Sequence, residues 1–171
     1  MLELYVIRHG LAGKPLEDTQ LDEDRPLTKK GKDRMKDVAK GLDELGVSLD
    51  AILSSPLARA KETAQIVEKY CSDAGSIEYT DLLKPGASND KLIEFLNGLE
   101  GKDKAAVNAV AIVGHEPFLS GFASYCLAKG KNSFIRLKKG GVLALELDGA
   151  LKPGQCKLAW LMEPWQLEEL A

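Results

Sequence analysis

Both histidines of this 171-residue chain stand beside a glycine at the end of an apolar run. His9 follows the run Leu4–Ile7 and Arg8, and His115 follows a run that ends at Val113. Apolar runs of this length favour buried strands, and open α/β sheets bind ligands just beyond the carboxyl ends of their strands. A single histidine in such a place would most often be structural, but here both histidines of the chain stand at expected strand ends, which favours a shared site.

A further strand is expected at Leu49–Leu53, and it leads into the sequence Ser54–Pro56. Proline is favoured at the first position of a helix, so Pro56 is expected to open one, with Arg59 in its first turn. The free N–H groups at a helix start attract anions. This second strand end therefore combines hydroxyl groups, a helix start and a guanidinium.

Arg8, His9, Arg59 and His115 together suit phosphoryl transfer to an imidazole. Guanidiniums match phosphoryl oxygens with paired hydrogen bonds. Neutral His9 would attack phosphorus in line and become phosphorylated, while the other three side chains hold the oxygens and offset their charge. The nearby guanidiniums should lower the pKa of His9 and keep it nucleophilic, and an arriving phosphate would favour protonation of His115.

Other chemistries lack their sequence signatures. The chain has no GxxxxGK[ST] loop and no GxSxG motif, and no histidine, cysteine or carboxylate cluster has metal-ligand spacing. We therefore expect no metal and no cofactor. The formal net charge of −3 gives no reason to expect nucleic-acid binding, and no apolar run is long enough to cross a bilayer. An odd set of three cysteines reads as reduced thiols of a cytoplasmic protein.

The expected elements alternate between strands and helices, which is typical of an α/β protein, here of one domain spanning residues 1–171. Besides the strands named above, strands are expected at Ile77–Tyr79, Ala105–Val113, Val142–Leu147 and Lys157–Met162, the last two forming an antiparallel hairpin. Helices are expected after Thr28, after Pro56, after Asn89 or Asp90, after Pro117, and within Trp165–Ala171. Leu11–Pro26 is expected to be a surface loop whose acidic residues 22–24 are solvated.

Four short motifs, taken together and in order, resemble those of the histidine phosphatase (phosphoglycerate-mutase-like) superfamily. They are Arg8-His9-Gly10, Arg25–Thr28 with Gly31, Ser54–Pro56 with Arg59 and Thr63, and Val113–Pro117. The short connections are most similar to those of SixA-type phosphohistidine phosphatases, and the resemblance covers residues 1–147. It implies a three-layer α/β/α sandwich with a mostly parallel central sheet and an antiparallel edge.

The resemblance also implies roles for the site residues. His9 is the implied nucleophile, Arg8 and Arg59 bind phosphate, and His115 is the second histidine of the phosphate pocket. Gly10 would let the backbone turn sharply or approach the substrate closely. Arg25 would lie at the rim, where it either touches substrate or makes a salt bridge at the start of the following helix.

The family's larger members carry a catalytic glutamate in an insertion that this chain replaces with the short segment Tyr79–Asn89. An alkoxide leaving group needs a proton from a general acid, whereas a protonated phosphohistidine ring can leave as neutral imidazole. Asp18 is the carboxylate near His9 in sequence that could serve as an acid. We therefore expect a metal-independent, monomeric phosphatase that acts on phosphohistidine in a partner protein and binds phosphate or sulfate. The alternatives are a phosphatase or mutase for small phosphate esters, and a non-catalytic module that binds phosphoproteins.

Overall fold

A mixed β-sheet forms the centre of the computed structural model, which describes residues 1–72, 77–100, 106–130 and 132–171. Its strands within these ranges are β1 (Leu2–Arg8), β2 (Ala51–Ser54), β3 (Ile77–Tyr79), β4 (Ala109–Gly114), β5 (Val142–Leu147) and β6 (Lys157–Met162). The strand order is β3-β2-β4-β1-β5-β6, with the first four parallel and β5 antiparallel to both of its neighbours. The predicted parallel sheet with an antiparallel edge is confirmed.

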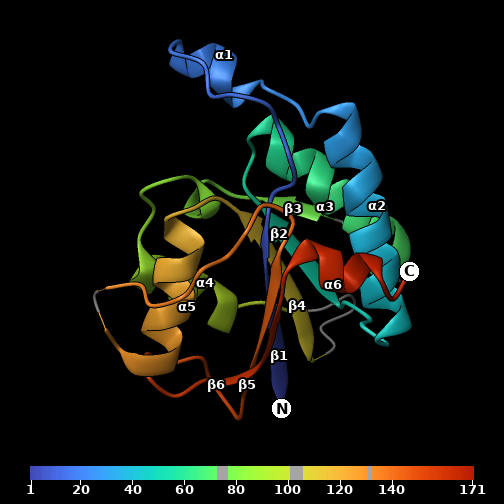
Figure 1. Ribbon diagram of the computed structural model, residues 1–171. Coiled ribbons are helices and arrows are strands. Elements are labelled where there is room, and N and C mark those ends of the chain that lie inside the picture. The colour runs from blue at the N-terminus through green and yellow to red at the C-terminus, as the bar shows by residue number, and fades with distance from the viewer. Residues whose placement is uncertain (73–76, 101–105, 131) are drawn as a thin grey trace.

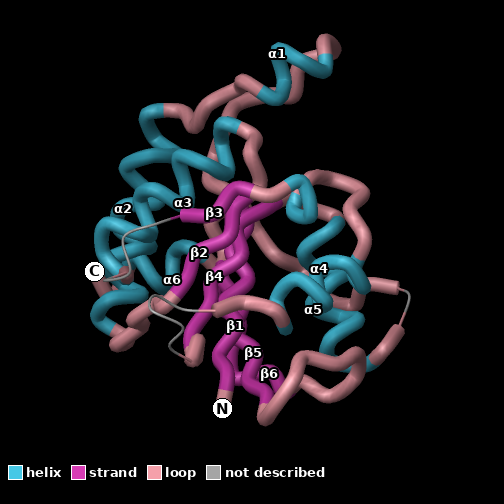
Figure 2. Tube along the Cα trace, turned by 180° about the vertical axis from the view of Figure 1, so that it is seen from behind, coloured by secondary structure: helices cyan, strands magenta, loops and turns pink. Residues whose placement is uncertain are grey.

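Helices cover both faces of this sheet (Figure 1). They are α1 (Thr19–Glu23), α2 (Lys29–Glu44), α3 (Ala58–Cys71), the short 3-10 helix η1 (Asp81–Leu83), α4 (Asn89–Asn97), α5 (Phe118–Ala128) and α6 (Pro164–Glu168). Helices α2, α3 and α6 lie on one face and α4 and α5 on the other, as Figures 1 and 2 show from opposite sides. The predicted three-layer sandwich is therefore confirmed, and α1 alone projects from its body.

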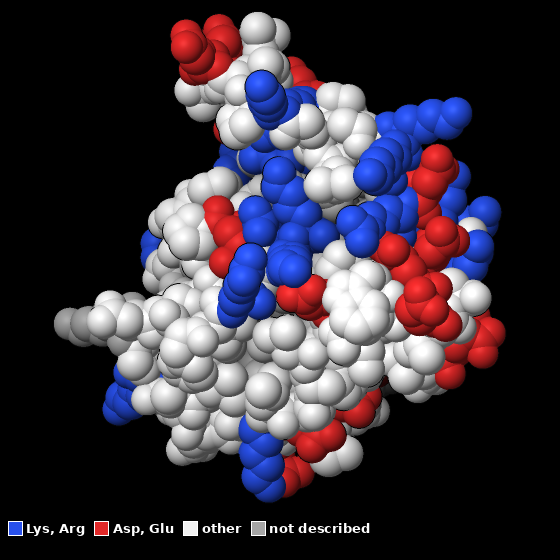
Figure 3. Space-filling view, in the orientation of Figure 1, with Lys and Arg blue, Asp and Glu red and all other residues white. Residues whose placement is uncertain are grey.

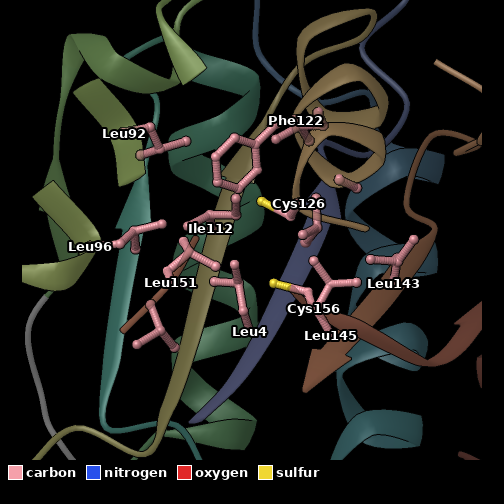
Figure 4. Close-up of a cluster of buried hydrophobic side chains, with 14 of the residues drawn as sticks. Leu4, Leu92, Leu96, Ile112, Phe122, Cys126, Leu143, Leu145, Leu151 and Cys156 are labelled. Atoms are coloured by element: carbon pink, nitrogen blue, oxygen red, sulfur yellow. The ribbon is translucent and has the colours of Figure 1, made fainter. Parts of the chain in front are cut away.

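Alternating side chains of β1 supply both hydrophobic cores, because successive residues of a strand point to opposite faces. Leu4 and Val6 belong to the core under α4 and α5, part of which Figure 4 shows, whereas Tyr5 and Ile7 belong to the core under α2 and α3. All residues of β4 are buried as well. The two adjacent strands that precede the histidines are thus packed on both faces, which fixes the positions of their carboxyl ends.

Some predicted boundaries were wrong, each for a local reason. Helix α3 begins at Ala58 rather than at Pro56, because sheet pairing continues through the Ser55 N–H, which donates to the Val113 carbonyl at 2.9 Å. The N-cap of α4 is Ser88 and not Asn89 or Asp90, since the Ser88 hydroxyl accepts the N–H of Lys91.

Two further differences concern segments rather than caps. The predicted loop Leu11–Pro26 contains α1, and the strand expected from Ala105 begins at Ala109, with Ala105 itself outside the described residues. No helix within the described ranges is long and apolar enough to cross a membrane.

Candidate active site

The carboxyl ends of β2, β4 and β1 lie side by side at one edge of the sheet. The register pairs Arg8 with Gly114, and the His9 N–H donates to the Gly114 carbonyl at 3.1 Å. His9 and His115, each directly after its strand, therefore meet, and their ring centroids lie 5.0 Å apart with the planes tilted by 53°. Adjacent parallel strands thus bring together two residues that are far apart in sequence.

The hydrogen bonding of His9 fixes which ring nitrogen carries the proton. Its Nδ1 lies 2.7 Å from the carbonyl oxygen of Gly10, and because a carbonyl can only accept, Nδ1 is the protonated nitrogen. The lone pair is then on Nε2. Burial lowers the pKa of His9 to about 3, and the charges of His115, Arg59 and Arg8 act in the same direction, against the bond to Gly10. The predicted lowering of the pKa is confirmed, although burial contributes more than the guanidiniums do.

His115 is almost fully enclosed, with 2% of its surface exposed. Its Nε2 lies 2.8 Å from the Ser55 hydroxyl, while its buried Nδ1 has no hydrogen-bond partner within the described chain. Burial, followed by the charges of Arg59 and Arg8, lowers the pKa of His115 to about 3. Both imidazoles are therefore neutral at physiological pH until an anion arrives.

Arg8 and Arg59 each engage one terminal nitrogen with the protein and leave another donor unused. Arg8 Nη1 donates to the Leu137 carbonyl at 2.9 Å, and Arg59 Nη1 donates to the Asp22 carbonyl at 2.8 Å. Burial lowers the pKa of both guanidiniums, which nevertheless stay charged. The Nε atoms of both arginines are buried and have no partner among the described residues.

Those two Nε atoms and His115 Nδ1 are the buried side-chain polar atoms that lack a partner in the described part of the chain. Buried polar groups are nearly always hydrogen-bonded, and each exception calls for an explanation. Here all three belong to side chains that the sequence assigns to one anion pocket, around the His9 ring. A bound oxyanion would supply the acceptors that these atoms need.

Thr63 joins the arginine-bearing helix to the end of β1. Its hydroxyl donates to the Arg59 carbonyl at 2.7 Å and accepts the Gly10 N–H at 3.1 Å. Thr63 formed part of the family motif, but nothing in the sequence assigned it this contact. It holds the backbone next to His9 and the helix that carries Arg59 at a fixed distance.

Gly10 is required for a reason that differs from the expected one. Its backbone φ does not lie in the left-handed region. A Cβ at this position would instead lie 2.6 Å from Cγ of Met35, a residue of α2. Both of its polar backbone groups are already bonded, to Thr63 and to His9. The glycine therefore permits close packing of the segment after β1 against α2, while contact with substrate stays a prediction.

Arg25 bonds to the protein rather than standing free at the rim. Its Nε donates to Asp22 at 2.9 Å and its Nη1 to the carbonyls of Ala12 and Gly13 at 2.7 and 3.2 Å. This arrangement favours the salt-bridge alternative. Asp22 in turn lies 3.4 Å from Arg59, so the interpretation of Asp22 as a merely solvated acid was wrong. The hydrogen bonds from Arg25 and the Leu16 N–H hold the pKa of Asp22 below its usual range.

Asp18 lies outside this cluster of side chains. It is exposed and caps the projecting helix α1, where its carboxylate accepts the N–H of Leu21 at 3.0 Å. Glu116 lies closer to the cluster than Asp18 does, since its charge acts on Arg8 and raises the pKa of that guanidinium. Its carboxylate accepts the Ser120 N–H at 2.9 Å. Within the described ranges, histidines, cysteines and carboxylates form no group that could hold a metal ion.

Comparison with known proteins places this geometry in context. A sequence model of the histidine phosphatase superfamily (branch 1) matches residues 4–84, which include His9 and Arg59. An uncharacterised protein of Picosynechococcus sp. is 35% identical over 149 residues, and the alignment covers 87% of each chain.

Two solved structures share the fold over nearly the whole chain. The protein histidine phosphatase SixA, solved with tungstate, superposes with a TM-score of 0.79 at 24% identity, covering 97% of this chain and 99% of that one. Phosphoserine phosphatase from Entamoeba histolytica, solved with 3-phosphoglyceric acid, gives a TM-score of 0.66 at 20% identity, covering 95% and 98%. Together with the sheet order, these similarities confirm the predicted phosphoglycerate-mutase-like fold.

Proposed function

The chain belongs to the histidine phosphatase superfamily, and from this premise we propose that it hydrolyses phosphohistidine on a partner protein without a metal. The proposal is carried by three buried polar atoms that have no partner among the described residues, Arg8 Nε, Arg59 Nε and His115 Nδ1. The His115 ring lies next to the His9 ring, and the charges of both arginines act on His9. The fold shared with SixA, which was solved with the oxyanion tungstate, supports the same assignment.

The first chemical step follows from the protonation state of His9. Its Nε2 lone pair attacks phosphorus in line, an N–P bond to His9 forms, and the N–P bond of the substrate breaks. The leaving imidazole carries its own proton and departs neutral. Arg8, Arg59 and a protonated His115 bind the phosphoryl oxygens, and such preorganised donors usually supply the largest part of the catalytic effect.

The second step releases phosphate. A water molecule attacks phosphorus from the side that the leaving imidazole has vacated, and the bond from phosphorus to His9 breaks. His9 recovers its lone pair on Nε2, since the Gly10 carbonyl keeps the proton on Nδ1 throughout. The water proton leaves with the phosphate, so the site returns to its starting state.

The positions of the carboxylates favour an N–P substrate over a phosphate ester. Asp22 is held ionised by Arg25, so it is a poor proton donor at neutral pH, and Asp18 is committed to capping α1. An ester would need a general acid to protonate its alkoxide, whereas a protonated phosphohistidine would not. We further propose that the chain acts as one domain, in the cytoplasm and as a monomer.

Hydrolysis or transfer of small phosphate esters is the second candidate function. It is favoured by Glu116, a half-buried carboxylate whose charge acts on Arg8, and by the fold shared with phosphoserine phosphatase. A non-catalytic binding module is less consistent with the site, because binding an anion requires hydrogen-bond donors and not the unprotonated Nε2 of His9.

The test is a side-by-side assay of a phosphohistidine protein, a phosphoserine peptide and a sugar phosphate, each with EDTA present. We expect the phosphohistidine protein to be hydrolysed fastest. His9→Ala should abolish both turnover and the phosphoenzyme trapped by rapid acid-free quenching. Equal or faster hydrolysis of the esters would replace the proposed substrate with the second candidate, and full activity of His9→Ala would overturn the covalent mechanism.

A further inference from the structure

A surface groove of about 420 Å³ has Arg8 in its lining. We call it the basic groove, because its lining includes Arg8, Arg34, Arg136, Lys138 and Lys139, together with Trp165 and one carboxylate, Glu163. Lys and Arg side chains gather at the centre of the face seen in Figure 3, below the projecting α1. The groove therefore adds a larger cationic surface to the small phosphate pocket.

Three of the cations in the basic groove, Arg8, Arg136 and Lys139, form no salt bridge with a described residue. Lys138 pairs with Glu163 at 2.8 Å, and Arg34 pairs with Glu168. Arg136 is exposed. The hydrogen bond from Lys138 lowers the pKa of Glu163, and the charge of Arg136 also helps to lower it, so the charge of Arg136 is partly balanced within the chain. The side-chain donors of Arg136 and Lys139 can still bind an anionic group from outside the chain.

The basic groove is tied directly to the active site. The Gly140 N–H lies 3.1 Å from both the Arg8 and the His9 carbonyl oxygens, and Leu137 accepts the Arg8 side chain. The segment that carries Arg136 and Lys139 is therefore anchored to the strand end that carries the nucleophile. The basic groove and the candidate active site therefore share Arg8.

Trp165 provides an apolar surface in the basic groove. About 54% of its surface is exposed, and its Nε1 donates to Glu163 at 3.0 Å, which fixes the ring. Exposed tryptophans and arginines are the residue types most enriched among the energetically important residues of protein interfaces. Cations around a fixed aromatic ring suit a peptide segment that carries both carboxylates and apolar groups.

We propose that the basic groove binds acidic residues that flank the phosphorylated histidine of the partner protein. This inference rests on the proposed function, since it extends the substrate from a phosphoryl group to a phosphorylated acidic segment. Charge complementarity selects that segment over a neutral or basic one. The exposure of Arg136 and Lys138 favours a macromolecule, because a small ligand would be held better by enclosed charges.

The test uses two phosphohistidine peptides of equal length, one with aspartates flanking the histidine and one with serines. In the variant Arg136→Gln/Lys139→Gln we expect the ratio of kcat/KM on the acidic peptide to that on the neutral peptide to fall about tenfold at low salt. The fall should shrink as salt is raised, because exposed charges are screened. The matched control is Lys152→Gln/Lys157→Gln, which removes the same charge at exposed positions outside the groove and should leave the ratio unchanged.

A second readout separates this inference from the proposed function. Fluorescence of Trp165 follows binding of an acidic peptide without phosphate to the inactive His9→Ala protein, with Trp165→Phe as the signal control. Tighter binding of the acidic than of the neutral peptide, lost in Arg136→Gln/Lys139→Gln, supports the groove whatever the reaction is. Equal binding of both peptides, or an unchanged kinetic ratio in the variant, overturns the inference, and preferential binding of a short RNA would assign the groove to a different partner.

Discussion

Replacing Arg59 with methionine tests the proposed contribution of this guanidinium to phosphate binding. Arg59 is 6% exposed, and its Nε has no partner among the described residues. Methionine retains an unbranched apolar stem, so the packing of α3 is largely kept, while the charge and all donors are lost. Loss of one preorganised donor to a developing oxyanion costs on the order of 3 kcal/mol. We therefore expect phosphorylation of His9 to slow by roughly 10²- to 10³-fold.

The assay is rapid-quench measurement of phosphoenzyme formation with a phosphohistidine substrate. Arg59→Met should still accumulate phosphoenzyme, only slowly, because His9 keeps its lone pair and its bond to Gly10. Thermal unfolding of the variant controls for loss of structure, and Asp22 should keep its bond to Arg25. A rate within threefold of wild type in a folded variant would refute the reasoning, since the unused donor of Arg59 would then contribute nothing.

Three further changes test other parts of the site. Ser55→Ala removes the hydrogen-bond partner of His115 Nε2 and should lower kcat about tenfold. The pH profile of kcat should also change, and an unchanged profile would show that the 2.8 Å contact does not orient the ring. Burial lowers the pKa of both histidines from the ordinary value of 6.5 to about 3 in the folded protein. Between these two pH values the unfolded chain therefore binds more protons than the folded chain does. The free energy of unfolding, measured with urea, should therefore fall as the pH drops from about 6.5 towards 3, by up to about 1.4 kcal/mol per pH unit for each histidine. A His9→Asn/His115→Asn variant should lose this pH dependence, and a variant that keeps the full slope would contradict the prediction. Gly10→Ala should lower the free energy of unfolding by about 1–3 kcal/mol, because the added Cβ contacts Met35. The loss should be smaller in a Met35→Ala background, and an equal loss in both backgrounds would show that Met35 is not the source of the strain.

The sequence was most informative where apolar strands end in polar residues. The pattern at Arg8-His9 and at His115 predicted a common edge of a parallel sheet, and the register of β1 with β4 brings the two rings together there. The alternation of strands and helices likewise predicted an α/β protein, and the resemblance to the histidine phosphatase superfamily implied its three layers. These features follow from local composition, which the sequence displays directly.

The remaining features depend on contacts between distant segments. Asp22 looked like one of several solvated acids, and only the fold shows that it bonds to Arg25 and Arg59. The Leu137 carbonyl, which positions Arg8, carries no sequence signal at all because it is a backbone group. Gly10 was recognised as important, yet the crowding by Met35 that requires a glycine there becomes visible only when α2 is packed against the strand.

Strand β1 pairs with β4 on one side and with β5 on the other along nearly its whole length. Local fluctuations that open edge strands and loops leave such a doubly paired central strand closed until the molecule opens globally. The backbone amides of β1 should accordingly exchange hydrogen with solvent among the slowest in the protein. His9 therefore directly follows the segment that we expect to open last, whereas α1 projects from the body of the molecule.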